Sequence, residues 1–203
     1  AAPRAPADHP HRVRAHVVGL EKRPATAAEV AEMCGHIATA MEQGAVGFST
    51  GLIYEPGRYS TTDEVVALAK ECRPYTGIYA THMRNEGDKL LEAVDEALHI
   101  AREAAIPLHI SHHKSAGRRN WGRAKDSLAK IDAASAAGMD VTLDVYPYTA
   151  GSTILAAIVQ NGAFESGPNA LGSIAPEDVV IASAAKRPDF ARRSIAALAP
   201  ALG

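Results

Sequence analysis

Two short histidine clusters are the part of this sequence best suited to chemistry. His82 lies in the run Thr81–Gly87 and His112 in the run Ser111–Lys114, and each run follows a short apolar segment. Neutral imidazole is a good zinc ligand, and zinc with a bound water can generate hydroxide near neutral pH. Two imidazoles brought together would form half of such a site. The alternative is that both are ordinary hydrogen-bonded histidines at strand ends, and their spacing leaves both interpretations open.

Two cations accompany the histidines. Lys114 and Arg84 could bind a substrate carboxylate, since a flexible ammonium or a forked guanidinium suits that anion. A salt bridge with Glu86 or Asp88 is the competing interpretation, and it is as good a one for Arg84.

A third polar group follows a later apolar run. Tyr146 and Tyr148 flank Pro147, which keeps the backbone extended, and their hydroxyls could donate to a developing oxyanion. Ordinary packing at a strand end is the alternative. Asp144 is either an acceptor that supports a neighbouring ligand or a polar residue of the sheet interior.

The elements that must position these residues alternate between short apolar runs and longer periodic segments. This alternation predicts βα units and a parallel sheet, whose carboxyl strand ends carry the active site in such folds. Thr26 and Glu29 have the spacing of a capping box, and Thr61 or Thr62 caps the next helix. Strands are expected at 15–19, 45–49, 77–81, 107–111 and 139–145, and helices at 26–43, from 61 or 62 onward, at 87–105 and at 123–137.

Strand alternation indicates where each histidine points. His82 shares the parity of the apolar residues before it, and so does His112, which predicts that both point into a barrel. His109 and His113 have the opposite parity and are expected to pack or to support a ligand. After Tyr148, glycines and prolines break the pattern, with a short strand expected at 179–182 and a helix at 191–198.

Composition bounds the function. The 203 residues are 47% hydrophobic and 22% charged, with a net charge of −2, so nothing favours binding to nucleic acid or to an anionic membrane. No apolar run approaches the roughly 18 residues of a spanning helix, and the first residues lack a signal-peptide core. Cys34 and Cys72 have no metal-like spacing, which predicts reduced thiols in a cytoplasmic protein. The missing initial methionine is consistent with a truncated chain.

Four segments, in this order, resemble the D-aminoacylase (N-acyl-D-amino-acid deacylase) family of the amidohydrolase superfamily. The segments are Gly44–Gly57, Tyr79–Gly87, Ile110–Lys114 and Asp144–Thr153. The resemblance implies a partial TIM-like (β/α) barrel and zinc-dependent hydrolysis of N-acyl-D-amino acids to a D-amino acid and a carboxylate. It further implies that His82 and His112 hold zinc, and that Lys114, Tyr146 and Ser152 contact the substrate carboxylate and carbonyl, with Tyr146 stabilising the oxyanion.

The resemblance also shapes the domain prediction. We expect a loose segment at 1–13, the central βα units of the barrel at 14–150, and an abbreviated lid insert with the start of the next barrel segment at 151–203. None of the expected strands ends in the family's early His-x-His motif, and no residue matches its upstream metal-ligating cysteine or its catalytic aspartate. The chain is therefore expected to be an internal fragment that is inactive alone.

Two other functions stay open. Related amidohydrolases of the dihydroorotase and hydantoinase type open cyclic amides, usually with a carboxylated lysine on an earlier strand, and no lysine follows 45–49. A non-catalytic fragment is the second alternative, since a partial barrel leaves open sheet edges. The acyl group, the D-amino acid, the number of metals and the oligomeric state are not readable from the sequence.

Overall fold

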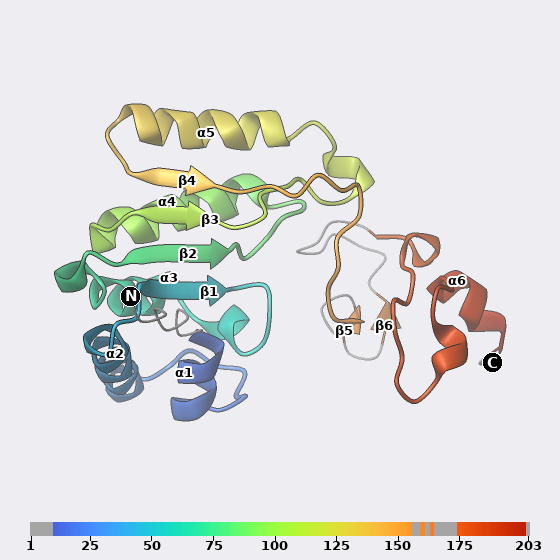
Figure 1. The fold of residues 1–203 in the computed structure, drawn as a ribbon, viewed down its shortest axis with the longest axis horizontal. Helices are drawn as coiled ribbons and strands as arrows, with labels where there is room; N and C mark the ends of the chain where they lie inside the picture. The colour runs from blue at the N-terminus through green and yellow to red at the C-terminus, as the bar shows by residue number, and fades with distance from the viewer. Residues whose placement is uncertain (1–9, 156–158, 161–162, 165–173, 202–203) are drawn as a thin grey trace.

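Four parallel strands form the centre of the protein in the computed structural model, which describes residues 10–155, 159–160, 163–164 and 174–201. The strands pair in the order β1-β2-β3-β4 and point the same way (Figure 1). Their bounds are Gly47–Gly51 (β1), Ile78–His82 (β2), Leu108–Ile110 (β3) and Val141–Leu143 (β4). Each agrees with a predicted strand to within a few residues.

A helix precedes or follows each strand. Figure 1 shows α3 and α4 behind the sheet, with α2 and α5 on either side of it. The helices are α1 (Pro10–Val17), α2 (Ala27–Glu42), α3 (Thr62–Lys70), α4 (Leu90–Ala104) and α5 (Ala124–Ala136). This arrangement, repeated over four strands, is that of consecutive βα units.

The predicted helix caps are confirmed. Thr26 and Glu29 form a capping box at the start of α2, and the Thr61 side chain accepts a hydrogen bond from the backbone N–H of Glu64 at the start of α3. Gly44 and Gly138, which have φ values of +100° and +92°, follow the ends of α2 and α5. These local signals place the helices correctly because they depend only on neighbouring residues.

The predicted strand at 15–19 is wrong, because Pro10–Val17 forms α1, which also takes residues 10–13 out of the expected loose segment. Val13 and Arg14 are buried on the inner side of this helix. The Arg14 guanidinium forms an ion pair with Glu64, which is also buried, and donates to the carbonyl oxygen of Pro56 at 3.1 Å. A partner fifty residues away thus fixes the helix.

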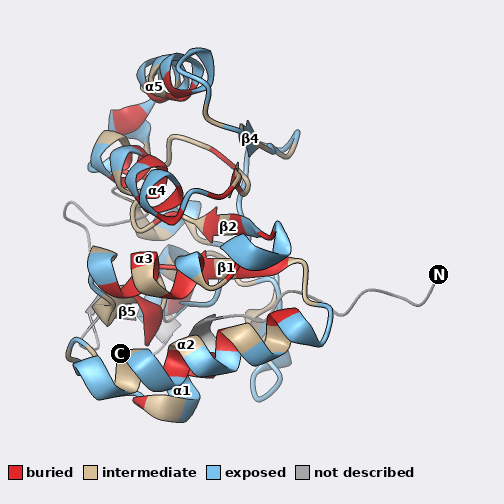
Figure 2. Cartoon of the chain, turned by 90° about the vertical axis from the view of Figure 1, so that its left-hand side faces the viewer, coloured by how far each residue is buried: buried red, intermediate tan, exposed pale blue. Residues whose placement is uncertain are grey.

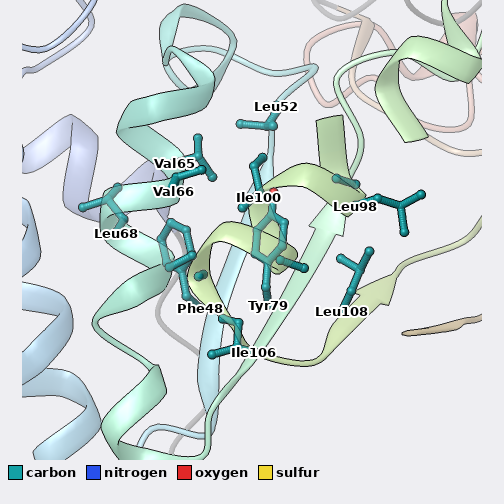
Figure 3. Close-up of a cluster of buried hydrophobic side chains, with 14 of the residues drawn as sticks. Phe48, Leu52, Val65, Val66, Leu68, Tyr79, Leu98, Ile100, Ile106 and Leu108 are labelled. Atoms are coloured by element: carbon teal, nitrogen blue, oxygen red, sulfur yellow. The ribbon is translucent and has the colours of Figure 1, made fainter. Parts of the chain in front are cut away.

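The hydrophobic core lies between the helices and one face of the sheet. Phe48, Tyr79 and Leu108 are in register on adjacent strands and are almost fully buried, among side chains from α3 and α4 (Figure 3). Figure 2 shows buried residues along β1 and β2 and on the inward sides of the helices, whereas β4 is more exposed. The other face presents the row Ser49, Ala80, His109 and Thr142.

The segment after β4 lies beyond the carboxyl ends of the strands (Figure 1). It contains a short antiparallel pair, β5 (Val159–Gln160) and β6 (Ala163–Phe164), and the helix α6 (Ile195–Leu198). The strand expected at 179–182 is reduced to one antiparallel bridge between Val180 and Ser194, and the helix expected at 191–198 is shorter than predicted. Short 3-10 turns cover Gly57–Tyr59, Arg73–Tyr75, Arg118–Asn120, Pro176–Asp178, Pro188–Phe190 and Ala199–Ala201.

Every helix among the described residues is too short or too polar to cross a membrane.

Candidate metal and substrate site

His82 is the last residue of β2, and the strand fixes the side to which it points. Tyr79 and Thr81 are buried on the helix side, and both lie within hydrogen-bonding distance, 2.8 Å, of the Thr50 hydroxyl. Strand alternation then places Ala80 and His82 on the face that the helices leave uncovered. The prediction that His82 points to the barrel side thus agrees with the structure.

His112 reaches the same side for another reason. Leu108 and Ile110 face the helices and are buried, whereas His109 lies in the uncovered row, so the parity argument assigned β3 wrongly. The backbone of His112 has a φ of +41°, in the left-handed region. For a residue other than glycine this conformation costs on the order of 1–3 kcal/mol, and it ends the alternation of the strand.

The two predicted zinc ligands meet at the carboxyl ends of β2 and β3. The distance between His82 Nδ1 and His112 Nε2 is 2.9 Å, and their ring centroids are 4.4 Å apart. About one-seventh of the His82 side chain and a third of the His112 side chain are exposed. The predicted pairing of these imidazoles is therefore present in the structure.

Glu86 is a third donor that the sequence analysis left without a role. Its Oε1 lies 3.7 Å from His82 Nε2, 3.2 Å from His112 Nδ1 and 2.6 Å from Lys114 Nζ. Asn85 accepts backbone hydrogen bonds from Gly87 and Lys89 through its side chain, which forms a turn beside Glu86. That asparagine was the one local signal of a tight loop here.

The charge of Glu86 is retained despite its burial. Its side chain is only 2% exposed, and burial opposes the charged form. The hydrogen bond from His112 and the electrostatic interactions with His82 and Lys114 outweigh this effect, so the pKa of the Glu86 carboxyl lies below its ordinary value. The site therefore contains a buried carboxylate.

This donor set fits a zinc ion. One ligand atom each from His82, Glu86 and His112 lies within 4.8 Å of the others. Two imidazole nitrogens and a carboxylate oxygen are a ligand combination found in catalytic zinc sites, where a further position remains open for water or substrate. Among the described residues, this is the one group of three such donors that lie so close together.

Arg84 has a structural role in this conformation. Its guanidinium pairs with Glu96 of α4 at 2.9 Å and donates to the carbonyl oxygens of Arg58 and Ser60, both at 3.0 Å. The salt bridge expected as its alternative role is present, although the partner is Glu96 rather than Glu86 or Asp88. The guanidinium connects the loops after β1 and β2 to the helix α4.

Lys114, a predicted substrate residue, lies beside the histidine pair, and Tyr146, another, lies near Lys114. The Lys114 ammonium lies 2.9 Å from His112 Nδ1 and 5.5 Å from the centroid of the Tyr146 ring. Burial and the nearby charge of Glu86 raise the pKa of the Tyr146 hydroxyl, which keeps it protonated and able to donate. Tyr148 is largely exposed, and its ring stacks on Tyr146 with centroids 6.4 Å apart.

Ser152 lies on a neighbouring open pocket of about 480 Å³ that Tyr54, Thr153 and Ile154 also line. The Tyr54 ring centroid is 4.9 Å from that of His82, and its hydroxyl lies 3.1 Å from the Thr153 hydroxyl. The loop after β1 therefore connects the pocket to the histidine pair, a role for Tyr54 that the sequence did not indicate.

His109 and His113, the other histidines on or after β3, lie apart from the pair of His82 and His112. His113 is buried, with its Nε2 2.9 Å from the Ser127 hydroxyl of α5, which agrees with the packing role expected for it. His109 Nε2 lies 2.8 Å from Asp144 Oδ2, and this hydrogen bond is the main reason why the pKa of Asp144 is lowered. The backbone N–H of His112 donates to the other oxygen of that carboxylate.

Comparison with known proteins connects this site to a group of deacylases, although no model of a known protein family matches the chain. The chain is 45% identical over 143 residues to a D-aminoacylase, and 47% identical over 119 residues to an N-acyl-D-glutamate deacylase, both from Alcaligenes xylosoxydans xylosoxydans. These matches cover 70% and 59% of this chain but 29% and 24% of the relatives. The chain thus spans less than a third of the length of these relatives.

Solved structures agree with the sequence matches. A crystal structure of D-aminoacylase, described as defining a novel subset of amidohydrolases, superposes with a TM-score of 0.80 at 35% identity, over 94% of this chain and 37% of that one. An N-acyl-D-glutamate deacylase from Bordetella bronchiseptica, complexed with zinc and a phosphonate mimic of the tetrahedral intermediate, gives 0.80 at 32% identity, over 95% and 38%. These matches confirm the resemblance and the predicted fold class, an α/β chain with part of a (β/α) barrel.

Proposed function

We propose that this chain, which is related in sequence and fold to the D-aminoacylases, forms the zinc and substrate site of an N-acyl-D-amino-acid deacylase. The reaction is hydrolysis of the amide bond to give a D-amino acid and a carboxylate. The observation that carries the proposal is the convergence of His82, His112 and Glu86 at the carboxyl ends of β2 and β3, where folds of this class carry their active sites.

In this proposal, His82 and His112 hold the zinc ion and Glu86 is a third donor within reach. When bound, zinc polarises a carbonyl and lowers the pKa of a coordinated water. Glu86 contributes a buried negative charge that offsets the charge of the ion. The neutral imidazoles contribute lone pairs without adding charge.

Lys114 and Tyr146 are the residues that we assign to the substrate. The Lys114 ammonium, a quarter exposed, lies beside the histidine pair, where it can bind the carboxylate of an acylated amino acid. The Tyr146 hydroxyl donates to the carbonyl oxygen as negative charge develops on it. Ser152, on the adjoining pocket, is assigned to the same substrate.

The cyclic-amide alternative has less support. Enzymes of that type usually bridge two metals with a carboxylated lysine on an earlier strand, and β1, Gly47–Gly51, contains no lysine.

Location in the cytoplasm stays part of the proposal and is supported by the thiols. Cys34 and Cys72 are both free, and burial raises the pKa of each to about 11.

Zinc titration of the purified 203-residue chain tests the metal site. We expect zinc binding by the wild type, and a loss of affinity of about 100-fold or more in His82→Ala and His112→Ala, because each removes a ligand. Glu86→Gln should weaken binding by about tenfold, since an amide lacks the charge that offsets the ion.

His99→Ala is the matched control, since His99 is an exposed histidine on α4. It should bind zinc like the wild type. Equal affinities in all four variants would contradict the proposed site.

Hydrolysis of N-acetyl-D-amino acids, compared with their L enantiomers, tests the reaction. We expect no turnover by the 203-residue chain alone, because no residue in it matches the family's general base. We expect D-selective, zinc-dependent turnover by a protein of the relatives' length that carries this segment. Turnover by the isolated chain, or the absence of D-selectivity in the longer protein, would contradict these expectations.

A further inference from the structure

Asp144, which directly follows β4, holds the turn after β3 in place. Asp144 Oδ1 accepts a hydrogen bond from the backbone N–H of His112 at 2.6 Å, and its main-chain oxygen accepts one from the N–H of His113 at 2.8 Å. The backbone N–H of Asp144 donates to the Ile110 carbonyl at 3.1 Å. Both the side chain and the backbone of Asp144 therefore hold the turn in which His112 has its positive φ.

His109 holds the second oxygen of the same carboxylate. Its Nε2 lies 2.8 Å from Asp144 Oδ2, and its Nδ1 lies 2.9 Å from the Thr142 hydroxyl. His109 and Thr142 are register partners in the row that the helices leave uncovered. Both nitrogens of the His109 ring therefore have a hydrogen-bond partner, and so do both oxygens of the Asp144 carboxylate.

This arrangement decides where the His112 ring points. The even-numbered residues of β3, Leu108 and Ile110, face the helices, and an extended backbone would continue that alternation. The left-handed turn instead brings His112 Nε2 to 2.9 Å from His82 Nδ1.

We propose that Asp144 and His109 are positioning residues, which hold His112 in its left-handed conformation and so aim its imidazole at the metal. The zinc part of this inference rests on the proposed function, whereas the conformational part does not. Asp144 and His109 are not proposed as metal ligands. Their effect on the metal site passes through the backbone of His112.

The first test needs no metal. Amide hydrogen exchange at His112 in the zinc-free chain should be slowed in the wild type by its hydrogen bond to Asp144. Asp144→Ala should speed exchange at His112 by at least about tenfold, whereas Asp144→Asn, whose side-chain oxygen still accepts, should retain most of the protection. Asp140→Ala, at the exposed start of β4, is the matched control and should change nothing at His112.

The second test measures the metal. Asp144→Ala should weaken zinc affinity by about 10–100-fold and alter the visible spectrum of bound cobalt, with partial recovery in Asp144→Asn. His109→Ala should give a smaller loss in the same direction. His109→Gln, which keeps a donor toward Asp144, should restore most of it.

The two proposals fail separately. A wild-type chain that binds no zinc contradicts the proposed function, while exchange at His112 still tests the positioning role. Unchanged exchange and unchanged zinc affinity in Asp144→Ala and His109→Ala would overturn the positioning role. If circular dichroism shows that Asp144→Ala does not fold, the His109 variants test the positioning role by the same two measurements. In these variants Asp144 is still present and keeps its own hydrogen bonds to the turn.

Discussion

At the scale of single residues, burial determines which groups keep a charge. Glu86 is buried and charged because two imidazoles and an ammonium surround one of its oxygens. Tyr79 is fully buried, and its hydroxyl forms hydrogen bonds with the neutral hydroxyls of Thr50 and Thr81. One residue is therefore stable as an anion in this fold, and the other as a neutral phenol.

Tyr79 gives a prediction about alkaline pH. Burial raises the pKa of its hydroxyl from 10 to about 12. Between these values the unfolded chain releases the phenol proton while the folded chain keeps it, so the free energy of unfolding falls as pH rises. We expect this group to remove roughly 2–3 kcal/mol between pH 10 and 12 and nothing below pH 9.

Urea unfolding of Tyr79→Phe checks this expectation. At neutral pH the variant should lose about 1 kcal/mol with its hydrogen bond, and above pH 10 its stability should fall less steeply than that of the wild type. Tyr148→Phe, at an exposed tyrosine, is the control and should follow the wild type. If the free energy of unfolding fell equally with pH in all three proteins, Tyr79 would not titrate in this way.

At the scale of elements, local patterns and distant partners contribute differently. Caps, glycines and apolar periodicity identified α2 to α5 and all four strands of the sheet, because each signal acts within a few residues. The helix α1 was missed because Arg14 is buried through partners that are distant in the sequence, Glu64 on α3 and the carbonyl oxygen of Pro56. The turn at His112 was missed for the same reason, since its partner Asp144 lies 32 residues away.

The candidate site was partly predictable for the same physical reasons. His82 and His112 could be chosen because motifs surround them, and strand ends bring them together. The contribution of Glu86 could not be predicted, because it depends on a loop that turns at Asn85 and on the approach of Lys114 from the loop after β3.

The ion pair between Arg14 and Glu64 gives the prediction at this scale. Both side chains are 2% exposed, so Arg14→Met leaves a buried carboxylate without its cation and should cost about 3–5 kcal/mol in urea unfolding. The double variant Arg14→Met with Glu64→Leu should recover much of this loss. Arg12→Met, on the exposed side of α1, is the control, and a cost equal to that of Arg14→Met would contradict the role of the pair.

At the scale of the whole molecule, β4 is one of the two edge strands of the sheet. Within the described part of the chain, β4 pairs only with β3, and Val145 just after it is 65% exposed. An unpaired strand edge offers free N–H and C=O groups to another strand. In the isolated chain, such an edge favours association between copies.

Light scattering during size-exclusion chromatography checks this expectation. We expect the mass of the purified chain to rise with concentration, and Val145→Lys to lower it by placing a charge beside the edge. Lys70→Ala, at an exposed lysine that ends α3, is the control and should behave as the wild type does. A monomer at every concentration would show that the edge is covered in solution.

The position of Asp144 in the chain has a further consequence for biosynthesis. Both histidines leave the ribosome before Asp144 does, because the chain emerges from its N-terminus. A nascent chain that ends before β4 therefore contains both proposed ligands but lacks the group that turns the second one toward the first. We therefore expect tight zinc binding to form only after the fourth strand has joined the sheet, and a nascent chain that ends before β4 to bind the ion more weakly.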